Sequence, residues 1–391
     1  MSSVSATLDE LRRAGLYREL RTIESAQGPR VRLEGRDVVL LCSNDYLGLA
    51  SDPRLRRAAA DAAERWGVGA GASRLVSGNM APHAQLEEEL AAFKGYPRCV
   101  LFGSGFLANT GVIPALAGPD EVILSDALNH ASIIDGCRQA RAETVVYEHA
   151  DLNALERGLR SAGGRPALIV TDAVFSMDGD LAPLREIVAL ASQYGARVLV
   201  DEAHATGVVG PGGRGLVTEL GLEEHVDVVI GTLSKALGSY GGFACCSPDL
   251  AELLINRARP LIYSTGLPPP VVAAGLAGLA VLRDDPDIVG RLWANARLLR
   301  AELASAGFDI EPGEMPIVPV IVGDPELTVG MSERVLAAGA FAQAIRPPTV
   351  PPGTSRLRLV ATAAHGEHEL RLAAGAVASA ARAVGALATS S

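Results

Sequence analysis

The stretch DVVIGTLSK, residues 227–235, decides the fold, because an apolar run typical of a buried strand leads through hydroxyl residues directly to a lysine. Similar short apolar runs alternate with amphipathic stretches of helical period from residue 98 to residue 246. This alternation is typical of a mostly parallel sheet covered by helices, since both faces of such strands are buried. We therefore predict an α/β fold with one large central sheet.

Seven apolar runs are expected to form the strands of this sheet. They span residues 99–102, 121–124, 144–147, 167–171, 197–200, 227–230 and 242–246. Stretches with helical period predict the covering helices at residues 53–66, 82–93, 107–116, 152–159 and 184–194. The expected result is one seven-stranded layer within a large domain.

Beyond Pro268 the sequence changes character. Alanine- and leucine-rich stretches predict helices at residues 271–283, 289–306 and 367–384, and short apolar runs predict strands at 317–322, 341–345 and 356–360. These elements indicate a smaller α+β domain. We therefore divide the chain into an N-terminal arm (1–45), a large domain (46–283) and a small C-terminal domain (284–391). The arm is expected to hold a helix and a short strand and to pack against the small domain or a partner subunit.

The chain has 391 residues, of which 48% are hydrophobic and 20% charged, a composition typical of globular proteins. A net charge of -10 with scattered basic residues argues against nucleic acid as a partner. Residues 1–20 lack an apolar signal core and no apolar run is long enough to span a membrane, so we expect a cytoplasmic protein without a membrane partner. The five cysteines form no Cys-x-x-Cys pair and are interpreted as buried small side chains. The histidines and carboxylates lack metal-ligand spacing, so no metal is expected.

Lysine is almost absent from this sequence. Only Lys94 and Lys235 occur among the 35 basic residues, and the others are arginines. A guanidinium cannot deprotonate, whereas an amine is able to act as a nucleophile, so a retained lysine invites a chemical explanation. Lys94 has a structural one, because it ends a helical stretch before Gly95, where a cation suits the helix dipole. Lys235 has none.

Asp201 and His204 follow the predicted strand 197–200 in the sequence Asp-Glu-Ala-His. In open α/β sheets ligands bind beyond the carboxyl ends of the strands. Taken alone, Asp201 is equally well explained as a loop residue that caps a helix. Together with Lys235 on another strand end, it provides the two essentials of a pyridoxal 5'-phosphate (PLP) site: a carboxylate for the pyridine nitrogen and an amine for the Schiff base.

A PLP site also needs a phosphate anchor, and Gly103-Ser104-Gly105-Phe106 is a candidate between a strand and a helix. Glycines let the backbone approach an anion, and the amides of a helix start bind anions. A Gly-x-Gly turn alone is more often structural than phosphate-binding. Thr232 and Ser234 are expected to add hydroxyl donors.

His130 begins the helix that follows the strand 121–124. It is equally well explained as a helix-start histidine with local partners or as an imidazole that stacks on a planar cofactor and exchanges protons with the substrate. The other histidines lie in polar sequence contexts and are interpreted as surface residues, with His204 as the exception. They are His83, His149, His225, His365 and His368.

Residues 344–358 combine several prolines with Arg346, Arg356 and Arg358. A rigid loop followed by a strand is able to aim a guanidinium, whose geometry suits a bidentate contact with a carboxylate. For each arginine separately, a solvated surface position is comparably plausible. As a group they favour a substrate clamp.

In these motifs the chain resembles the α-oxoamine synthase family of PLP enzymes, which have the aminotransferase-like type I fold. The resemblance covers nearly the whole length. The landmarks are SNDYLG (43–48), SRLVSG (73–78), NHAS (129–132), VFSMDG (174–179), DEAH (201–204) and TLSK (232–235).

The resemblance implies roles for individual residues. Lys235 would hold the cofactor, Asp201 would pair with the pyridine nitrogen and His130 would stack on the ring. Further cofactor contacts are implied for Ser176, His204, Thr232 and Ser234, and Gly105 and Phe106 would lie at the cofactor or the thioester side. Substrate contacts are implied for Asn44, Thr349, Arg358 and an N-terminal arginine, for which Arg18 and Arg21 compete and Arg18 is favoured.

Within this family, residues 344–358 are most similar to the members that condense L-alanine with a pimeloyl thioester of coenzyme A or acyl carrier protein. Glycine acetyltransferase, serine-palmitoyltransferase-like and plain aminotransferase activities are the alternative reactions. A non-catalytic scaffold is the alternative from another class, and the joint presence of Lys235, Asp201 and His204 argues against it. The family resemblance also implies a homodimer.

Overall fold

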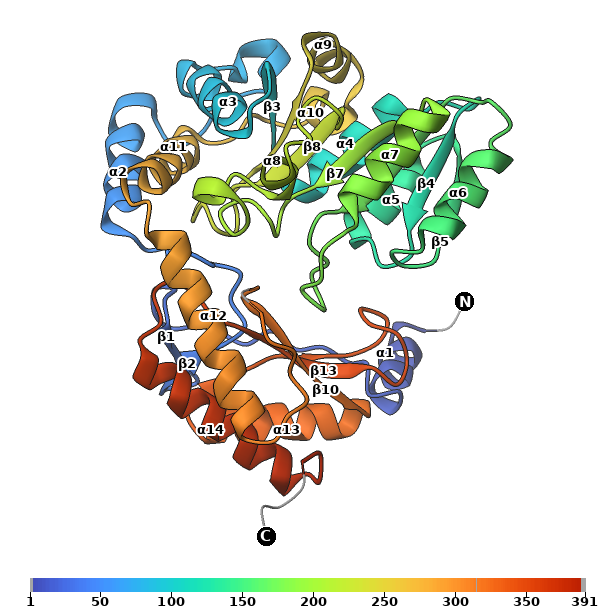
Figure 1. Cartoon of the computed structure of the whole chain (residues 1–391). Helices are drawn as coiled ribbons and strands as arrows, with labels where there is room; N and C mark the ends of the chain where they lie inside the picture. Colours follow the sequence, from blue (N-terminus) through green and yellow to red (C-terminus); the bar gives the residue numbers. More distant parts are fainter. Residues whose placement is uncertain (1–2, 314, 388–391) are drawn as a thin grey trace. The chain divides into compact units, whose positions relative to one another are not determined.

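The computed structural model describes residues 3–313 and 315–387, which form two compact units (Figure 1). One unit, here called the sheet unit, comprises residues 49–176 and 180–289. The other, the terminal unit, comprises the described parts of residues 1–48, 177–179 and 290–391. Each unit is described by itself below.

The sheet unit is built on a seven-stranded sheet in the order β3-β9-β8-β7-β6-β4-β5. The strands are β3 (Arg98–Phe102), β4 (Val122–Asp126), β5 (Glu143–Tyr147), β6 (Ala167–Asp172), β7 (Arg197–Asp201), β8 (Val228–Thr232) and β9 (Gly242–Cys246). Strand β9 runs antiparallel to its neighbours β3 and β8, and the other pairs are parallel. The α/β fold and all seven strands predicted from the sequence are confirmed.

The inner strands are buried on both faces, which explains their continuous apolar runs, whereas the edge strand β5 is mostly exposed. Every residue of β4, β6, β8 and β9 is buried. Apolar side chains of α4 (Gly105–Leu116), α5 (Ala131–Gln139) and α9 (Pro248–Arg257) share one core cluster with the strands. The other helices of this unit are α2 (Pro53–Trp66), α3 (Ala81–Lys94), α6 (Leu152–Ser161), α7 (Leu184–Tyr194), α8 (Leu216–Leu220), α10 (Arg259–Ile262) and α11 (Pro269–Asp284).

The parallel register brings polar residues to one edge of the sheet. Strands β4, β6 and β7 each end in an aspartate, and Asp172 pairs with Asp201 in the ladder. Strand β8 lies beside β7 and ends at Thr232. The carboxyl edge of the sheet, where ligands bind in open α/β sheets, therefore carries Asp126, Asp172, Asp201 and Thr232.

The terminal unit contains two three-stranded sheets. One has the order β1 (Arg30–Leu33), β2 (Arg36–Leu40), β11 (Ala340–Phe341), and the other β10 (Ile317–Gly323), β13 (Ser355–Val360), β12 (Ala344–Ile345). Its helices are α1 (Val4–Arg13), α13 (Pro325–Ala337), α14 (Glu367–Ala383) and α12 (Ile288–Ser305), which begins at the boundary of the sheet unit. Pairing of β2 with β11 places the N-terminal segment in the same unit as the C-terminal residues.

The strands of this unit differ from the sequence predictions in two places. The single strand expected at residues 341–345 is two short strands, because Phe341 pairs with Leu40 in one sheet while Ile345 pairs with Arg356 in the other. The arm holds a two-stranded hairpin rather than one strand. Among the described residues, no helix has the length and apolar character needed to cross a membrane.

Candidate active site

Lys235 lies three residues past the end of β8, where its Nζ is 2.8 Å from Nε2 of His204. His204 is buried and follows β7, so two neighbouring strand ends deliver the pair. The hydroxyls of Thr232 and Ser234 both donate to the carbonyl oxygen of Gly241, at 2.7 and 3.3 Å. The prediction made these hydroxyls donors to a cofactor; in this structure they brace the turn that carries the lysine.

Asp201 is 3% exposed and belongs to a chain of hydrogen bonds that ends at His130. Its carboxylate accepts from Nδ2 of Asn109 at 2.6 Å, and the same amide group donates to Oγ of Ser132 at 3.0 Å. Ser132 Oγ in turn lies 2.7 Å from Nδ1 of His130. The predicted acid and the predicted imidazole are thus joined through Asn109 and Ser132, which sequence reasoning did not assign to the site. A polar Asn109 inside the apolar helix α4 was the available signal.

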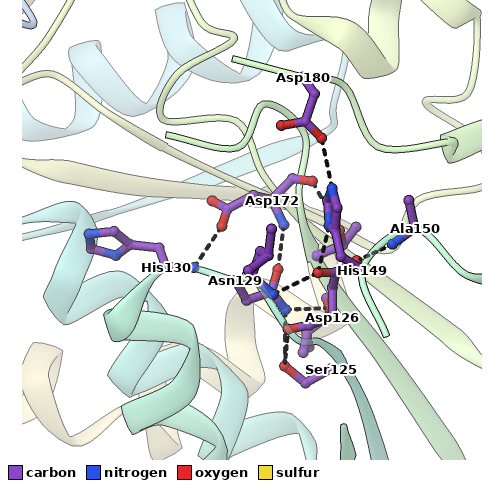
Figure 2. Close-up of polar contacts among 11 residues, drawn as sticks. Ser125, Asp126, Asn129, His130, His149, Ala150, Asp172 and Asp180 are labelled. Carbon is purple, nitrogen blue, oxygen red and sulfur yellow. Dashed lines mark hydrogen bonds and ion pairs between the residues drawn. The ribbon is translucent and has the colours of Figure 1, made fainter. Parts of the chain in front are cut away.

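Asp172 is a second buried carboxylate at this edge, and the sequence analysis missed it (Figure 2). It accepts from the backbone N–H of His130 at 2.7 Å, while its own N–H donates to Oδ1 of Asn129 at 2.9 Å. Burial, and then the adjacent charge of Asp201, raise the pKa of Asp172 well above its ordinary value. Asp172 is therefore favoured in its protonated form more strongly than an ordinary aspartate.

His130 is the N-cap of α5, as the sequence predicted. Burial lowers its pKa; the charge of Asp201 acts in the opposite sense, and that of Lys235 lowers the pKa further. The ring is therefore favoured in its neutral form near pH 7 and lies within the electrostatic reach of both groups.

The start of α4 faces the same strand end as the lysine. Ser104 is the N-cap and accepts from the N–H of Leu107 at 3.1 Å. The backbone of Gly105 approaches Thr232 so closely that a Cβ at Gly105 would lie 3.4 Å from the Thr232 Cβ. The first amides of a helix have no partner within the helix and bind anions. Gly105 and Phe106, predicted before the helix, form its first turn.

These groups fit PLP. An amine, a buried carboxylate and a helix start suited to phosphate lie along the carboxyl edge of one sheet, and the neutral imidazole of His130 is linked to the carboxylate. Among the described residues, no group of three or more histidines, cysteines, aspartates or glutamates is placed to hold a metal ion.

Arg358 and Asn44 meet within the terminal unit. Arg358 lies on β13, is 6% exposed, and donates to Oδ1 of Asn44 at 3.0 Å and to the hydroxyl of Tyr46 at 3.3 Å. Asn44 and Arg358, two of the residues predicted to contact substrate, therefore belong to one side-chain cluster in the structure.

The other two arginines of residues 344–358 hold protein groups. Arg356 forms an ion pair with Asp178, and Arg346 donates to the backbone oxygens of Gly15 and Tyr17. The structure therefore separates the three arginines, since of them Arg358 contacts Asn44, while Arg356 and Arg346 contact other protein groups. The acceptors of Arg356 and Arg346 are far from them in the sequence, so these contacts were not predictable from the sequence.

A cavity of about 480 Å³ in the terminal unit is lined by Arg18, Arg21, Arg346 and Thr349 together with the apolar side chains of Ile23, Leu20, Phe341 and Ile345. Arg21 forms ion pairs with Glu34, at 3.0 Å, and with Glu333. Arg18 is exposed, and its charge is among the causes that lower the pKa of Arg346, after burial. The geometry favours Arg18 over Arg21 as the arginine that meets a ligand.

Three of the residues interpreted from sequence context have different surroundings. His83 and His365 are buried, with Nε2 2.8 Å from the carbonyl of Leu267 and 3.1 Å from that of Leu40, so the prediction of surface histidines is wrong for both. Lys94 does end α3, but it is 1% exposed and its ammonium pairs with Glu202 at 2.5 Å. His225 and His368 are exposed as predicted, and His149 is partly buried.

A sheet whose carboxyl edge carries a lysine, a buried aspartate and an anion-binding helix start defines a PLP-dependent enzyme of the type I fold. The model for the aminotransferase class I and II family matches residues 36–377, and the chain belongs to this family. The cofactor and fold expected from the sequence are thereby confirmed.

The chain is similar to proteins of known activity over nearly its whole length. It is 53% identical to the 8-amino-7-oxononanoate synthase of Geobacter sulfurreducens, covering 96% of this chain and 97% of that protein. A serine palmitoyltransferase structure from S. paucimobilis with bound PLP–myriocin aldimine has a TM-score of 0.93 at 36% identity and covers 98% of both chains. The 8-amino-7-oxononanoate synthase structure from Francisella tularensis has a TM-score of 0.76 at 27% identity, covering 88% of this chain and 98% of that one.

Proposed function

We propose that this protein catalyses the decarboxylative condensation of L-alanine with a pimeloyl thioester, giving 8-amino-7-oxononanoate, carbon dioxide and the free thiol, a reaction of biotin biosynthesis. The observation that carries the proposal is the 53% identity to a relative of that name over 96% of the chain. The same name recurs among relatives that are 51% and 50% identical. Fold similarity alone would not select a substrate, since one architecture hosts many reactions.

When bound, PLP supplies an electron sink for negative charge that develops at the Cα of the amino acid. Asp201, the buried carboxylate at the end of β7, would keep the pyridine nitrogen protonated. Lys235 would bind the cofactor and take the proton from Cα of alanine at Nζ, which lies 2.8 Å from Nε2 of His204. His130 would pack against the ring as a neutral imidazole and share protons with the substrate.

The first turn of α4, with Gly105 and Phe106, binds the phosphate through backbone amides. Ser176 contacts the polar groups of the ring from the turn that follows β6. Thr232 and Ser234 support this binding indirectly, since both hydroxyls brace the lysine turn through Gly241.

Arg358 binds the carboxylate of alanine, and Asn44 orients the guanidinium. We expect Arg358→Ala to raise the KM for alanine by about tenfold or more, the loss expected for one charge-assisted contact, while the absorbance of bound PLP stays normal. Alanine titrations at saturating thioester measure this, with Arg356→Ala as the comparison, because Arg356 is held by Asp178. An unchanged alanine dependence would remove Arg358 from the substrate site.

Arg18 binds the terminal carboxylate of the pimeloyl chain, with Thr349 beside it on the cavity wall. Because Arg21 is committed to Glu34 and Glu333, we expect Arg18→Ala to raise the KM for the pimeloyl thioester by about tenfold and Arg21→Ala to lower thermal stability instead. Steady-state kinetics of both variants, together with their melting temperatures, decide the assignment. A larger KM effect from Arg21→Ala would reverse it.

The proposed function is tested by an assay of thiol release with alanine, glycine or serine against short and long acyl thioesters. Turnover with alanine and a pimeloyl thioester, on either coenzyme A or acyl carrier protein, is the expected result. The TM-score of 0.93 to a serine palmitoyltransferase makes serine with a long-chain thioester the alternative pair of substrates. Faster turnover of serine with a long-chain thioester would contradict the proposal, and faster turnover of glycine with a short thioester would indicate an acetyltransferase.

We further propose that the enzyme acts as a cytoplasmic homodimer. The support is the resemblance of its motifs to a family of dimeric enzymes. Light scattering of the purified protein measures the mass in solution, and a monomer at catalytic concentrations would contradict this part of the proposal.

A further inference from the structure

His149 lies between two carboxylates on different elements of the sheet unit (Figure 2). Its Nδ1 is 3.0 Å from Oδ1 of Asp126, and its Nε2 is 2.8 Å from Oδ2 of Asp180. The ring also meets Phe175 edge to face, with ring centroids 4.4 Å apart. Both ring nitrogens and one ring edge are therefore engaged, although the sequence context suggested a surface residue.

The contacts require a particular protonation state. A carboxylate only accepts hydrogen bonds, so a ring that faces a carboxylate from each nitrogen carries a proton on both. Burial lowers the pKa of His149, but the hydrogen bonds and charges of Asp126 and Asp180 outweigh burial and raise the pKa above its ordinary value. These two carboxylates are the charged groups that act on the ring, from β4 and from the turn before α7, and Phe175 after β6 is uncharged. The two contacts and the raised pKa together favour the imidazolium form of His149.

Asp126 holds the turn that presents His130. Its carboxylate accepts from the backbone N–H of Leu128 at 2.8 Å and from that of Ala150 at 2.9 Å. The N–H of Asn129 donates to the Asp126 carbonyl at 3.2 Å. His149 therefore contacts the aspartate from which the β4–α5 turn starts, four residues before the N-cap His130.

Asp180 holds the turn that presents Ser176. The carbonyl of Asp180 accepts from the N–H of Phe175 at 3.0 Å, and Val174 bridges Leu181. The side chain of Asp180 then reaches back to His149. One imidazolium consequently joins the turn of His130 to the turn of Ser176.

We propose that His149 is a positioning residue for the reaction, which sets the spacing of His130 and Ser176 around the cofactor without touching it. The inference rests on the proposed function, because that function gives His130 and Ser176 their roles. The ring of His149 contacts both acids and Phe175 at once. Loss of His149 would act through the two turns, so its effect should be measurable in PLP affinity and in backbone hydrogen exchange as well as in turnover.

The test compares His149→Asn with the wild type and with His225→Asn, an exposed histidine of the same unit. We expect His149→Asn to weaken the affinity of the apoprotein for PLP and to speed backbone hydrogen exchange in residues 126–131 and 173–181, with α9 unchanged. A misplacement of reacting groups by 1 Å is able to lower a rate by about 10²-fold, so kcat/KM should fall by about 10- to 100-fold. His225→Asn should behave as the wild type.

The pH profile separates positioning from a general loss of stability. The His149 pKa is raised in the folded protein. The ion pairs of His149 with Asp126 and Asp180 are therefore fully formed below the ordinary pKa of histidine and are lost as the pH rises through the raised value. The ratio of wild-type to variant kcat/KM should therefore be largest at low pH and shrink as the pH increases. A ratio that stays constant with pH, together with an unchanged PLP affinity, would overturn the proposal.

Asp180→Asn is the second variant, because it keeps the ring and removes one charge. We expect it to reproduce the hydrogen-exchange change at residues 173–181 with a smaller loss of kcat/KM. If His149→Asn does not fold, this variant decides the matter. Wild-type protein that fails to condense alanine with a pimeloyl thioester would reject the proposed function, while the PLP titration and hydrogen exchange would still decide the role of His149.

Discussion

Lys235→Ala abolishes turnover and the visible absorbance of covalently bound PLP, which is the largest effect we expect from any single substitution. Nζ of Lys235 is the amine at the carboxyl edge of the sheet, held 2.8 Å from Nε2 of His204. The substitution removes both the covalent attachment of PLP and the base for the Cα proton. Loss of a positioned base alone lowers rates by about 10²- to 10⁴-fold, so activity should fall by at least that factor.

The scarcity of lysine makes the measurement specific. Reduction of the holoenzyme with borohydride, followed by peptide mapping, should place PLP on the peptide with Lys235 and leave Lys94 unmodified. Lys94 is 1% exposed and its ammonium contacts Glu202, Thr206 and the carbonyl of Arg214. Label on Lys94, or a Lys235→Ala protein with wild-type activity, would overturn the assignment of the cofactor amine.

The sheet was predictable because its signal is local. Each buried strand is an apolar run bounded by loops, and all seven runs became strands within two residues of the expected bounds. Four helices were not predicted, namely α8, α9, α10 and α13. Ser247 and Asp324 cap α9 and α13, and a proline follows each cap, so the sequence carried a start signal for these two. Helices α8 and α10 have only five and four residues, which is too short for a helical period to be recognised.

The site was only partly predictable, because its supporting partners are distant in the sequence. Asn109 and Asp201 are 92 residues apart, and Lys94 and Glu202 are 108 apart. A polar sequence context does not reveal which polar side chain faces inward, so the burial of His83 was not predictable from it. The strand end pointed to Asp201, which is buried, whereas Asp172 on the neighbouring strand is identified through the register of the ladder.

Asp201→Asn is expected to cause the second largest loss, because it removes the partner charge for the pyridine nitrogen. The asparagine side chain is nearly isosteric, and its oxygen is able to keep the contact with Asn109 Nδ2 at 2.6 Å. Its amide nitrogen then replaces the oxygen that accepts from the backbone N–H of Ala203 at 2.8 Å, so that one hydrogen bond is lost as well. Each tenfold change in rate corresponds to about 1.4 kcal/mol, and a buried charge–charge contact is worth several times that for the developing carbanion. We therefore expect kcat to fall by about 10³-fold, with the protein folded.

The neighbouring groups provide the control for that result. The charge of Asp201 raises the pKa of Asp172 and that of His130, so Asp201→Asn should lower both, and Asp172 should ionise more readily. If Asp172 then supplies part of the missing charge, Asp201→Asn with Asp172→Asn will be less active than Asp201→Asn alone. Asp61→Asn, on the exposed side of α2, controls for loss of a carboxylate elsewhere. Steady-state kinetics at several pH values measure these effects, and a single variant with wild-type kcat would exclude Asp201 as the partner of the pyridine nitrogen.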